Sequence, residues 1–460
     1  MRTPCIPRAV AGTAVCMLAT ASMADGLQSL APITAHTDLQ SGEIVAYVSC
    51  VSQNSIIKLQ DLTGDGTRHG HGEAEQFFQP GIADSSLNSI SSVQAILAVE
   101  YDHLLIADGS TAESGSGVYR LRDLSGDGTA HGSGEAAVYW DGELPIDGSP
   151  AIDRPKAITI GPDGAVYIAD NNTLSAFDGA EAPEAVWRID EHPANEVTST
   201  GNVELHHELC AADHGFCLST EAYRWTEDGK LYFTSVDVWS NTVSVWVIEA
   251  DGTLFEYANE DDLLGIRLSS TGLAIHPATG RPVLAAADAN GRPLIVELAD
   301  HSGSGAIEHN DDLNILYHAD AAGSDALQSP IEVMDLAFAP DGSLWMLDDG
   351  SDSIIRFADG NGDGTFNGPG EVQTVYDAAE AELNGAAAIE LPRAIAFAIV
   401  PEAAQTGDLN HDGVVNGKDL AILLSAWGDC PAADPCPADL TGNGSVGGDD
   451  LSVLLRHWSD

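Results

Sequence analysis

The chain has 460 residues, with 18 Lys and Arg against 71 Asp and Glu, so its formal net charge is −53. A surface this acidic repels nucleic acid and anionic membranes, which argues against both as partners. It attracts divalent cations, although it is equally typical of proteins from saline habitats. The length suits one large domain and one small one, and a hydrophobic share of 44% is enough for a large core.

The first 24 residues predict a secretory signal peptide. Arg2 and Arg8 form a basic start, the apolar run AVAGTAVCMLATASMA follows, and small residues precede a cleavage site near Ala24. No later stretch reaches the roughly 18 apolar residues of a membrane span. We therefore expect a secreted or extracellular protein, with attachment at the cell surface as one variant.

Cleavage removes two of the seven cysteines, Cys5 and Cys16. An oxidising compartment favours disulfides within the two close pairs, which are Cys210 with Cys217 and Cys430 with Cys436. Cys50 is left over, and we expect a buried thiol in a strand.

A three-strand pattern recurs along residues 25–402. Its first strand appears as QAILAV, KAITIGPDG, EAYRWTEDG, GLAIHPATG, DLAFAPDG and RAIAFAIV. A turn of the Pro-Asp-Gly kind and a second strand usually follow. The second strands end at Asp108, Asp170, Asp237, Asp288 and Asp348. A third strand such as AVWRID comes next.

The two ends of this region complete each other. The last first-type strand, at Arg393, has no second or third strand after it, whereas residues 43–61 supply these two strands without a first. Joining them closes a ring. The fold class that we predict is therefore all-β: a six-bladed β-propeller with interlocked N- and C-terminal strands, followed by a small α-helical domain.

The pattern GPDGAVYIAD…AVWRID resembles the NHL-type and SMP-30/gluconolactonase-like six-bladed propellers. The resemblance implies that ligands bind around the central channel, on the face where the second strands end. It also implies a catalytic divalent ion held by one Glu, two Asn and one Asp. Glu221 and Asp348 are candidates for two of these ligands, while the asparagines are not identifiable. The favoured alternative is that each strand-ending Asp accepts backbone hydrogen bonds in its own turn.

Three loops on the opposite face share a spacing of carboxylates around Gly-Asp-Gly. Counted from the first Asp, oxygen-bearing residues occupy positions 1, 3, 5 and 13, and these positions suit calcium. They are Asp61, Thr63, Asp65 and Glu73; Asp123, Ser125, Asp127 and Glu135; and Asp359, Asn361, Asp363 and Glu371. Ordinary turns repeated by duplication are the alternative. A fourth unit from Asp300 lacks Asp at position 5, so we expect poor binding there.

Histidines suggest zinc at two places, and in both we prefer another interpretation. His69, His71 and His131 lie beside glycines in the loops above. The insertion HHELCAADHGFCLSTE, residues 206–221, combines His206, His207 and His214 with two cysteines. A seven-residue separation of these cysteines fits a disulfide loop better than a zinc knuckle.

The tail, residues 403–460, holds two loop–helix units with the ligand order of an EF-hand. The first offers Asp408, Asn410, Asp412, Val414 (through its carbonyl), Asn416 and Asp419; the second offers Asp439, Thr441, Asn443, Ser445 and Asp450. The pair resembles a type I dockerin, which implies folding on calcium and docking to a cohesin-like or surface-anchoring protein. Gly417-Lys418 and Gly448-Asp449, at the docking positions, are not a familiar matched pair. A stabilising C-terminal clip is the alternative.

Three functions follow from these observations. The first is a secreted calcium-binding propeller that binds a polysaccharide or a protein and docks through its tail. The second is a metal-dependent lactonase, or a carbohydrate-active hydrolase or lyase, with its site at the channel. The third is a structural component of an extracellular matrix or surface layer. Oxygen ligands converging near Glu221 and Asp348 would favour the second.

Overall fold

The computed structural model describes residues 27–30, 43–82, 90, 92–109, 117–141, 154–170, 185–190, 193, 203–209, 219–237, 240–320, 332–400, 409, 415, 417–430, 438, 440, 445–456 and 458. The predicted signal peptide, the cysteines at 210, 217 and 436, and most of the tail loops lie outside these residues.

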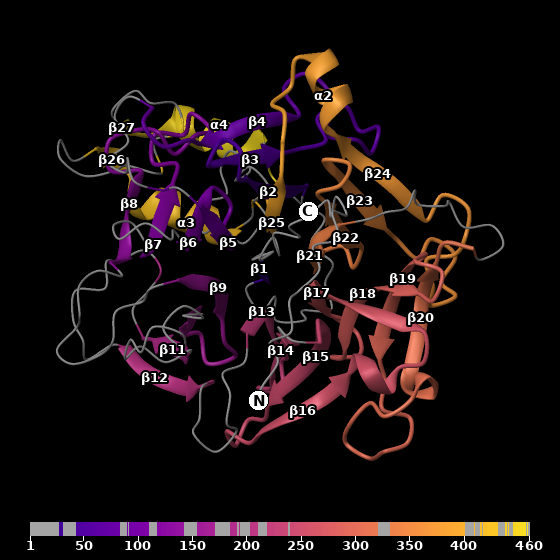
Figure 1. Cartoon of the computed structure of the whole chain (residues 1–460). Coiled ribbons are helices and arrows are strands. Elements are labelled where there is room, and N and C mark those ends of the chain that lie inside the picture. Colours follow the sequence, from indigo (N-terminus) through magenta and orange to yellow (C-terminus); the bar gives the residue numbers. More distant parts are fainter. Residues whose placement is uncertain are drawn as a thin grey trace, which may run out of the picture.

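Six four-stranded blades surround a central axis (Figure 1). We number them from the blade that joins the two ends of the ring. Blade 1 holds β25 (Pro392–Ile399), β2 (Ile44–Cys50), β3 (Ser55–Leu59) and β4 (Ala74–Phe78). Blade 2 holds β5 (Val93–Glu100), β6 (His103–Asp108), β7 (Gly117–Arg122) and β8 (Ala136–Asp141), and blade 3 holds β9 (Pro155–Ile160), β10 (Val166–Asp170), β11 (Ala185–Ile189) and β12 (Val203–Glu208).

The remaining three blades follow in chain order around the ring. Blade 4 holds β13 (Ser219–Trp225), β14 (Leu231–Asp237), β15 (Thr242–Ile248) and β16 (Leu254–Asn259). Blade 5 holds β17 (Ile266–Ile275), β18 (Pro282–Asp288), β19 (Pro293–Leu298) and β20 (Leu313–His318), and blade 6 holds β21 (Val333–Phe338), β22 (Leu344–Asp348), β23 (Ser353–Phe357) and β24 (Val372–Asp377). A short strand, β1 (Leu27–Leu30), pairs in parallel with β5.

The predicted ring closure is confirmed. Strand β25, from the end of the propeller, pairs antiparallel with β2, from Ile44 opposite Ile399 to Cys50 opposite Pro392. Hydrogen bonds between strands some 340 residues apart in sequence therefore hold the ring together, and blade 1 is the only blade among the described residues that is built from both ends.

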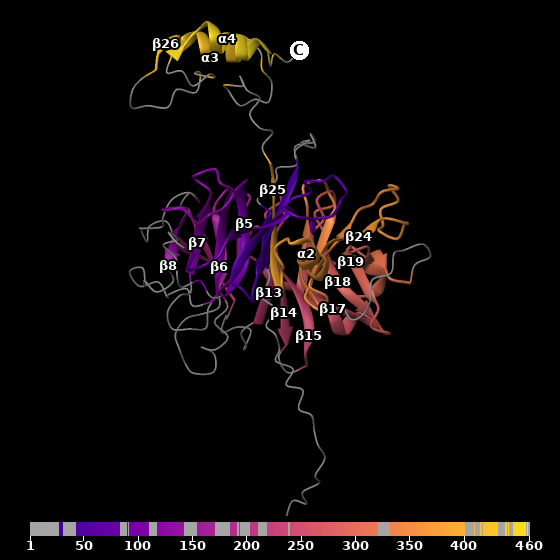
Figure 2. The same cartoon turned by 90° about the horizontal axis from the view of Figure 1, so that it is seen from above.

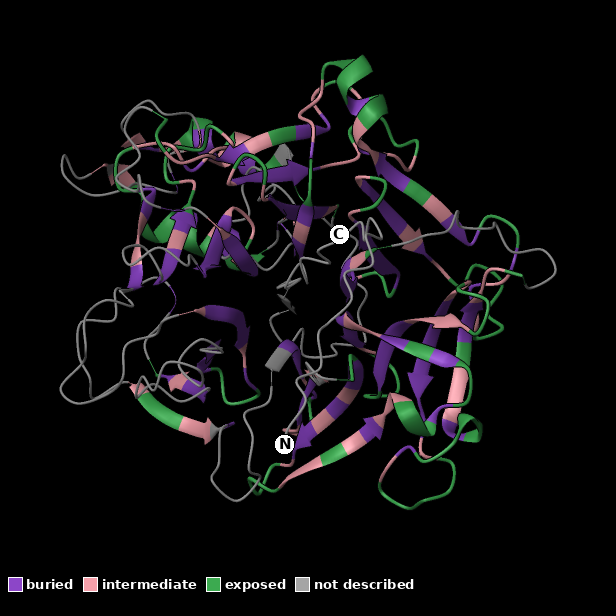
Figure 3. Cartoon of the chain, viewed as in Figure 1, coloured by how far each residue is buried: buried purple, intermediate pink, exposed green. Residues whose placement is uncertain are grey.

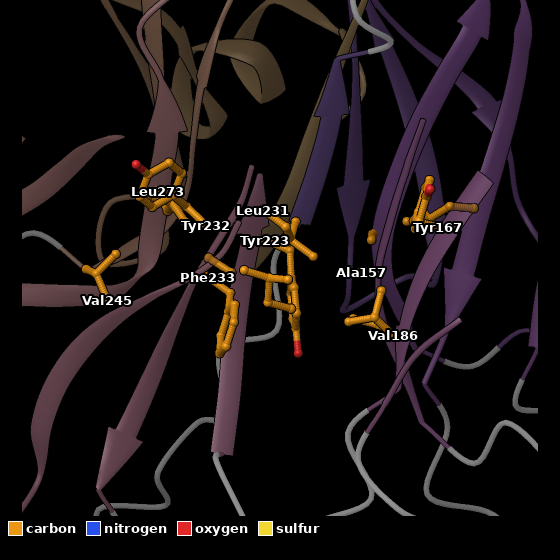
Figure 4. Packing of buried hydrophobic residues seen from close by; sticks show 14 of the residues in the cluster. Ala157, Tyr167, Val186, Tyr223, Leu231, Tyr232, Phe233, Val245 and Leu273 are labelled. Atoms are coloured by element: carbon orange, nitrogen blue, oxygen red, sulfur yellow. The ribbon is translucent and has the colours of Figure 1, made fainter. Parts of the chain in front are cut away.

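The core lies between neighbouring blades. Strands near the axis are buried along most of their length, as in β6, whereas outer strands such as β16 and β20 consist mainly of partly exposed residues (Figure 3). Side chains from blades 3, 4 and 5 interleave, among them Val186, Tyr223, Phe233 and Leu273 (Figure 4). The rings of Tyr223 and Phe233 stack with centroids 5.4 Å apart.

The tail contains two helices of equal length, α3 (Gly417–Ser425) and α4 (Gly448–Arg456), which lie side by side (Figure 2). The short strands β26 (Gly428–Asp429) and β27 (Ser445–Val446) pair beside them. Val415, Leu423, Val446 and Leu454 form the shared core, and each residue of the first unit has its counterpart 31 positions later. A helical tail domain is present, and its dockerin-like character stays a prediction. No described helix is long and apolar enough to span a membrane.

Candidate functional site

We call the face where first strands begin and second strands end the mouth face. Three strand-ending aspartates cap the blade starts there. Asp108 Oδ1 accepts the N–H of Ser92 at 2.9 Å, Asp170 Oδ1 accepts that of Arg154 at 2.7 Å, and Asp348 Oδ1 accepts that of Glu332 at 2.9 Å. Each donor stands 16 residues before its acceptor. These aspartates accept backbone hydrogen bonds as the favoured interpretation expects, but these three donors lie at the start of the blade, not in the turn that follows each Asp.

Cys50 occupies the same place at the end of β2 in blade 1. Its sulfur accepts the N–H of Glu390 at 3.4 Å and its thiol donates to the carbonyl of the same residue at 3.1 Å. Cys50 is 1% exposed and free. The prediction of a buried thiol in a strand is confirmed, and the sulfur serves as a cap.

Every first strand carries a β-bulge at the same level, just inside the mouth face. In each blade the pairing between the first and the second strand shifts register, because one or more residues of the first strand have no partner in the second. Around the ring these extra residues are Arg393 with Ala394, Gln94, Lys156, Glu221 with Ala222, Ser269–Gly272, and Met334. Since bulges re-aim side chains next to functional sites, this ring marks the mouth as the candidate site.

Polar side chains of the ring contact one another across neighbouring blades. Arg393 Nη1 donates to Gln94 Oε1 at 3.3 Å. Lys156 Nζ lies 3.9 Å from Glu221 Oε2, and both side chains are almost fully buried, at 1% and 7% exposure. The sequence points to Glu221 as a candidate but not to Gln94 or Lys156, because a bulge leaves no local mark in an apolar strand.

An ion pair joins β13 to β21, two blades away. Arg224 Nη2 donates to Asp335 Oδ1 at 2.8 Å, and Asp335 Oδ2 accepts the N–H of Ile395 from β25 at 3.1 Å. Both side chains are inaccessible to solvent or nearly so. Burial raises the pKa of Asp335, and the nearby guanidinium opposes that rise. The pair therefore ties three innermost strands together.

A cavity of about 510 Å³ opens beside the ring, between blades 4, 5 and 6. The four-residue bulge of β17 forms one wall, and Glu260, Arg267 and Glu332 supply its charged groups. Burial raises the pKa of Glu260 above its usual value. Its size and mixed lining are those of small-molecule sites.

Glu221 and Asp348 make separate contacts. Asp348 accepts hydrogen bonds from the N–H of Glu332 and the hydroxyl of Ser351, whereas Glu221 lies beside Lys156. Their place in a metal site that includes two asparagines stays a prediction. Within the described part of the chain, close triplets of His, Cys, Asp or Glu side chains occur only in two loops of the opposite face.

These two loops are the first two Gly-Asp-Gly loops. In the first, one oxygen each of Asp61, Asp65 and Glu73 lie within 4.8 Å of one another, and in the second the same holds for Asp123, Asp127 and Glu135. Three carboxylates this close repel each other unless a cation joins them, and all-oxygen ligands suit calcium. Thr63, Ser125 and the third loop lie outside these triplets.

All of the loops share one backbone network. The position-1 Asp accepts the N–H groups of positions 4 and 6, as Asp61 does from Gly64 at 2.7 Å and Gly66 at 2.9 Å. The buried position-13 carboxylate, Glu73 in the first loop, accepts from Thr63 at 3.1 Å and Gly70 at 2.8 Å. A Cβ at Gly70 would lie 2.5 Å from this carboxylate, so a side chain at position 10 of this loop would push the carboxylate aside.

The loops also fasten neighbouring blades. The position-8 N–H of each loop donates to a carbonyl in the outermost strand of the preceding blade. These bonds run from Arg68 to Val375, Ala130 to Phe77, Ile307 to Tyr257 and Phe366 to Leu316, at 2.6–2.8 Å. We call these loops clasps. The first two, which hold the carboxylate triplets, flank blade 1 on its two sides.

Among the described residues, three of the histidines considered for zinc contact other groups. His69 Nε2 lies 3.0 Å from Glu380, and His131 Nε2 accepts the N–H of Gln79 at 2.9 Å. His206 packs against Tyr167 and Trp225, with centroids 5.1 and 5.7 Å away. The cysteines of that insertion, with His214, lie outside the described residues.

In the tail, three predicted calcium ligands fall within the described residues. Asp419 and Asp450, at position 12 of each unit, are fully buried. Asp419 accepts the N–H of Leu409 at 2.8 Å, and Asp450 that of Gly447 at 2.7 Å. Ser445 lies in β27. The other eight, Asp408, Asn410, Asp412, Val414, Asn416, Asp439, Thr441 and Asn443, lie outside them. Cys430 is disulfide-bonded.

His276 should make the propeller sensitive to mild acid. Its Nδ1 accepts the N–H of Ala278 at 3.1 Å, and burial lowers its pKa below 6.5. The unfolded chain therefore takes up a proton first, so stability present above pH 6.5 falls as the pH drops through 6.5 toward the lowered value. Unfolding temperatures measured from pH 7.5 to 5.5 should decline more steeply than in His276→Asn, whose side chain keeps an acceptor but does not titrate. Equal slopes would contradict this role.

No protein-family model matches the sequence, and no curated protein matches it. Among solved structures, the periplasmic gluconolactonase PpgL of Pseudomonas aeruginosa is 15% identical, with a TM-score of 0.41, over 78% of this chain and 86% of that one. The calcium-binding protein regucalcin of Agrobacterium tumefaciens is 14% identical, with a TM-score of 0.33, over 56% and 67% of the two chains. Virginiamycin B lyase of Staphylococcus aureus is 14% identical, with a TM-score of 0.35, over 73% and 85%. These likenesses concern the fold alone.

Proposed function

We propose that this protein is a secreted propeller that binds a small molecule at the mouth of its channel. The observation that carries the proposal is the alignment of six β-bulges at one level, beside a cavity of about 510 Å³. Bulges re-aim side chains, and the residues left unpaired here include the polar Arg393, Gln94, Lys156 and Glu221.

The test is a calorimetric screen of small molecules, sugar acids, lactones and oligosaccharides among them. Binders should lose affinity at least tenfold in Ala286→Leu, which fills the cavity with side-chain volume, and keep it in Ile315→Leu, an exposed site on the outer strand β20. Binders that are indifferent to Ala286→Leu would move the site away from the mouth.

The same proposal gives calcium a structural role at blade 1. Asp61, Asp65 and Glu73 would hold one ion, and Asp123, Asp127 and Glu135 a second, because these triplets are anionic and built from oxygen. The ions would secure both sides of the blade that closes the ring. The third loop, with Asp359, Asn361, Asp363 and Glu371, serves as an internal comparison.

Chelation of calcium should lower the unfolding temperature of the propeller. An ion bound only by the native state stabilises by about 2.7 kcal/mol at one hundred times its dissociation constant. We expect Asp65→Asn with Asp127→Asn to remove most of the calcium-dependent shift, and Asp363→Asn to leave it unchanged. A shift that survives the double variant would assign the calcium effect elsewhere, for example to the tail.

We further propose that the tail attaches the protein to a cohesin-like or surface-anchoring partner. Leu424 and Trp427 are about half exposed, and their counterparts 31 positions later, Leu455 and Trp458, are exposed as well. Repeated apolar side chains outside a small core are typical of docking surfaces. Binding to an immobilised cohesin should fail in Trp427→Ala with Trp458→Ala; unchanged binding would favour the stabilising clip.

Glu260 supports a second candidate function, catalysis at the same mouth. A carboxyl whose pKa is raised by burial can donate a proton to a leaving group, as a lactonase, hydrolase or lyase requires. Glu260→Gln should then lower kcat by about 10²–10⁴ with little change in KM. Turnover that is equal in both proteins would remove Glu260 from the reaction.

A further inference from the structure

The floor of the mouth cavity is apolar. Met334, Met346, Ile295 and Tyr317 line it, and all of them are at most 5% exposed. A ligand covered with hydroxyl groups would lose hydrogen bonds to water against these side chains without replacing them. The cavity therefore favours a ligand whose buried part is apolar.

The cavity has a fixed shape because the bulge of β17 is anchored. Thr271 donates its hydroxyl hydrogen bond to the carbonyl of Val333, and Thr234 donates to that of Ser270. Gly272 allows the close approach, since a Cβ there would lie 2.8 Å from Val333 Cγ1 and 3.0 Å from Ala285 Cβ. A preformed pocket needs little ordering when a ligand enters.

The charged groups of the cavity are mainly acidic. Glu260 and Glu332 line it, and Arg267 is the one cation among its lining residues. Glu332 and Arg267 are both exposed, whereas Glu260 is half-buried. The blade 6 side of the mouth is acidic as well. Burial and the neighbouring carboxylates Asp352, Glu332 and Asp348 raise the pKa of Asp349, and Arg393 opposes that rise. With a net charge of −53, the protein also steers cations toward its surface.

From these observations we infer that the mouth binds a cationic amphiphile, a compact apolar body carrying a protonated amine. The apolar body contacts Met334 and Met346 on the floor, and the ammonium group lies near Glu260 and Glu332. This inference rests on the proposed small-molecule site and names the class of its ligand.

The methionines provide a direct readout. The chain holds five, of which Met1, Met17 and Met23 lie within residues 1–24, so the other two both line this cavity. In protein labelled with methyl-¹³C methionine, these two signals can be assigned with Met334→Leu and Met346→Leu. The probes are 2-phenylethylammonium, neutral 2-phenylethanol and anionic 3-phenylpropionate, which share the phenyl body and differ in charge.

We expect the ammonium probe to shift both methionine signals and to bind at least tenfold more tightly than 3-phenylpropionate at low salt. Glu260→Gln with Glu332→Gln should remove that preference, whereas Glu256→Gln, on the outer strand β16, should keep it. Equal or tighter binding of the anion, binding that leaves both methionine signals unmoved, or no binding of any probe would overturn the inference. The proposed small-molecule site has its own test: it is contradicted if no compound of the wider screen binds more weakly to Ala286→Leu than to the wild type.

Discussion

Replacing Asp335 with alanine is expected to lower the free energy of unfolding of the propeller by about 3–5 kcal/mol. The change leaves the guanidinium of Arg224 buried without its counter-ion. It also removes the acceptor for the N–H groups of Leu336 and Ile395, at 2.8 and 3.1 Å. Since these groups belong to β13, β21 and β25, three blades lose a shared anchor.

Denaturant unfolding followed by tryptophan fluorescence measures this loss. The control is Arg356→Ala in the same blade, where the pair with Asp341, at 3.0 Å, is about one third exposed and should contribute at most about 1 kcal/mol. Replacing both partners, Arg224→Met with Asp335→Leu, should restore much of the stability because no charge stays buried alone. A loss no larger in Asp335→Ala than in the control would contradict the anchoring role.

Replacing Glu73 with alanine should cost roughly 1–3 kcal/mol, because its carboxylate accepts two backbone hydrogen bonds inside the first clasp. The loop that it braces also carries the bond from Arg68 to Val375, so the contact between blades 1 and 6 should weaken with it. Hydrogen exchange at Val375 and its neighbours, together with chemical unfolding, follows both effects.

Glu75→Ala is the matched control, since Glu75 is exposed in the adjacent strand β4. Glu371→Ala should cost a similar amount without calcium, because Glu371 makes the same bonds to Gly360, Asn361 and Gly368. Added calcium should widen the gap between wild type and Glu73→Ala alone. If added calcium increases the difference in unfolding free energy between wild type and Glu371→Ala equally, the third loop binds calcium as well.

The strand order, the ring closure and the capping aspartates could be predicted because each leaves a periodic mark. Strand ends repeat at Asp108, Asp170 and Asp348, and the unpaired strand at Arg393 finds its partners at residues 43–61. The bulges could not be predicted, because the extra residue is defined by its lack of a partner in the neighbouring strand. Gln94 and Lys156 were missed for this reason.

The loops show a similar division. Their carboxylate spacing was visible in the sequence, and so was the missing Asp at position 5 of the fourth loop. The spacing could not show that the fourth loop keeps the backbone network. There Asp300 accepts the N–H of Gly303 at 2.7 Å, and Asp312 accepts that of His301 at 2.9 Å. A clasp needs only the carboxylates at positions 1 and 13, whereas a cation needs position 5 too. The repeat therefore serves structure in four loops, and we propose that it holds a metal in a subset of them.

The most direct test of the small-molecule site is crystallographic fragment screening of the calcium-loaded protein. We expect fragments in the cavity between blades 4, 5 and 6, in contact with Met334 and near Glu260. A cavity that stays empty while fragments collect on the clasp face or along the outer strands would contradict this expectation.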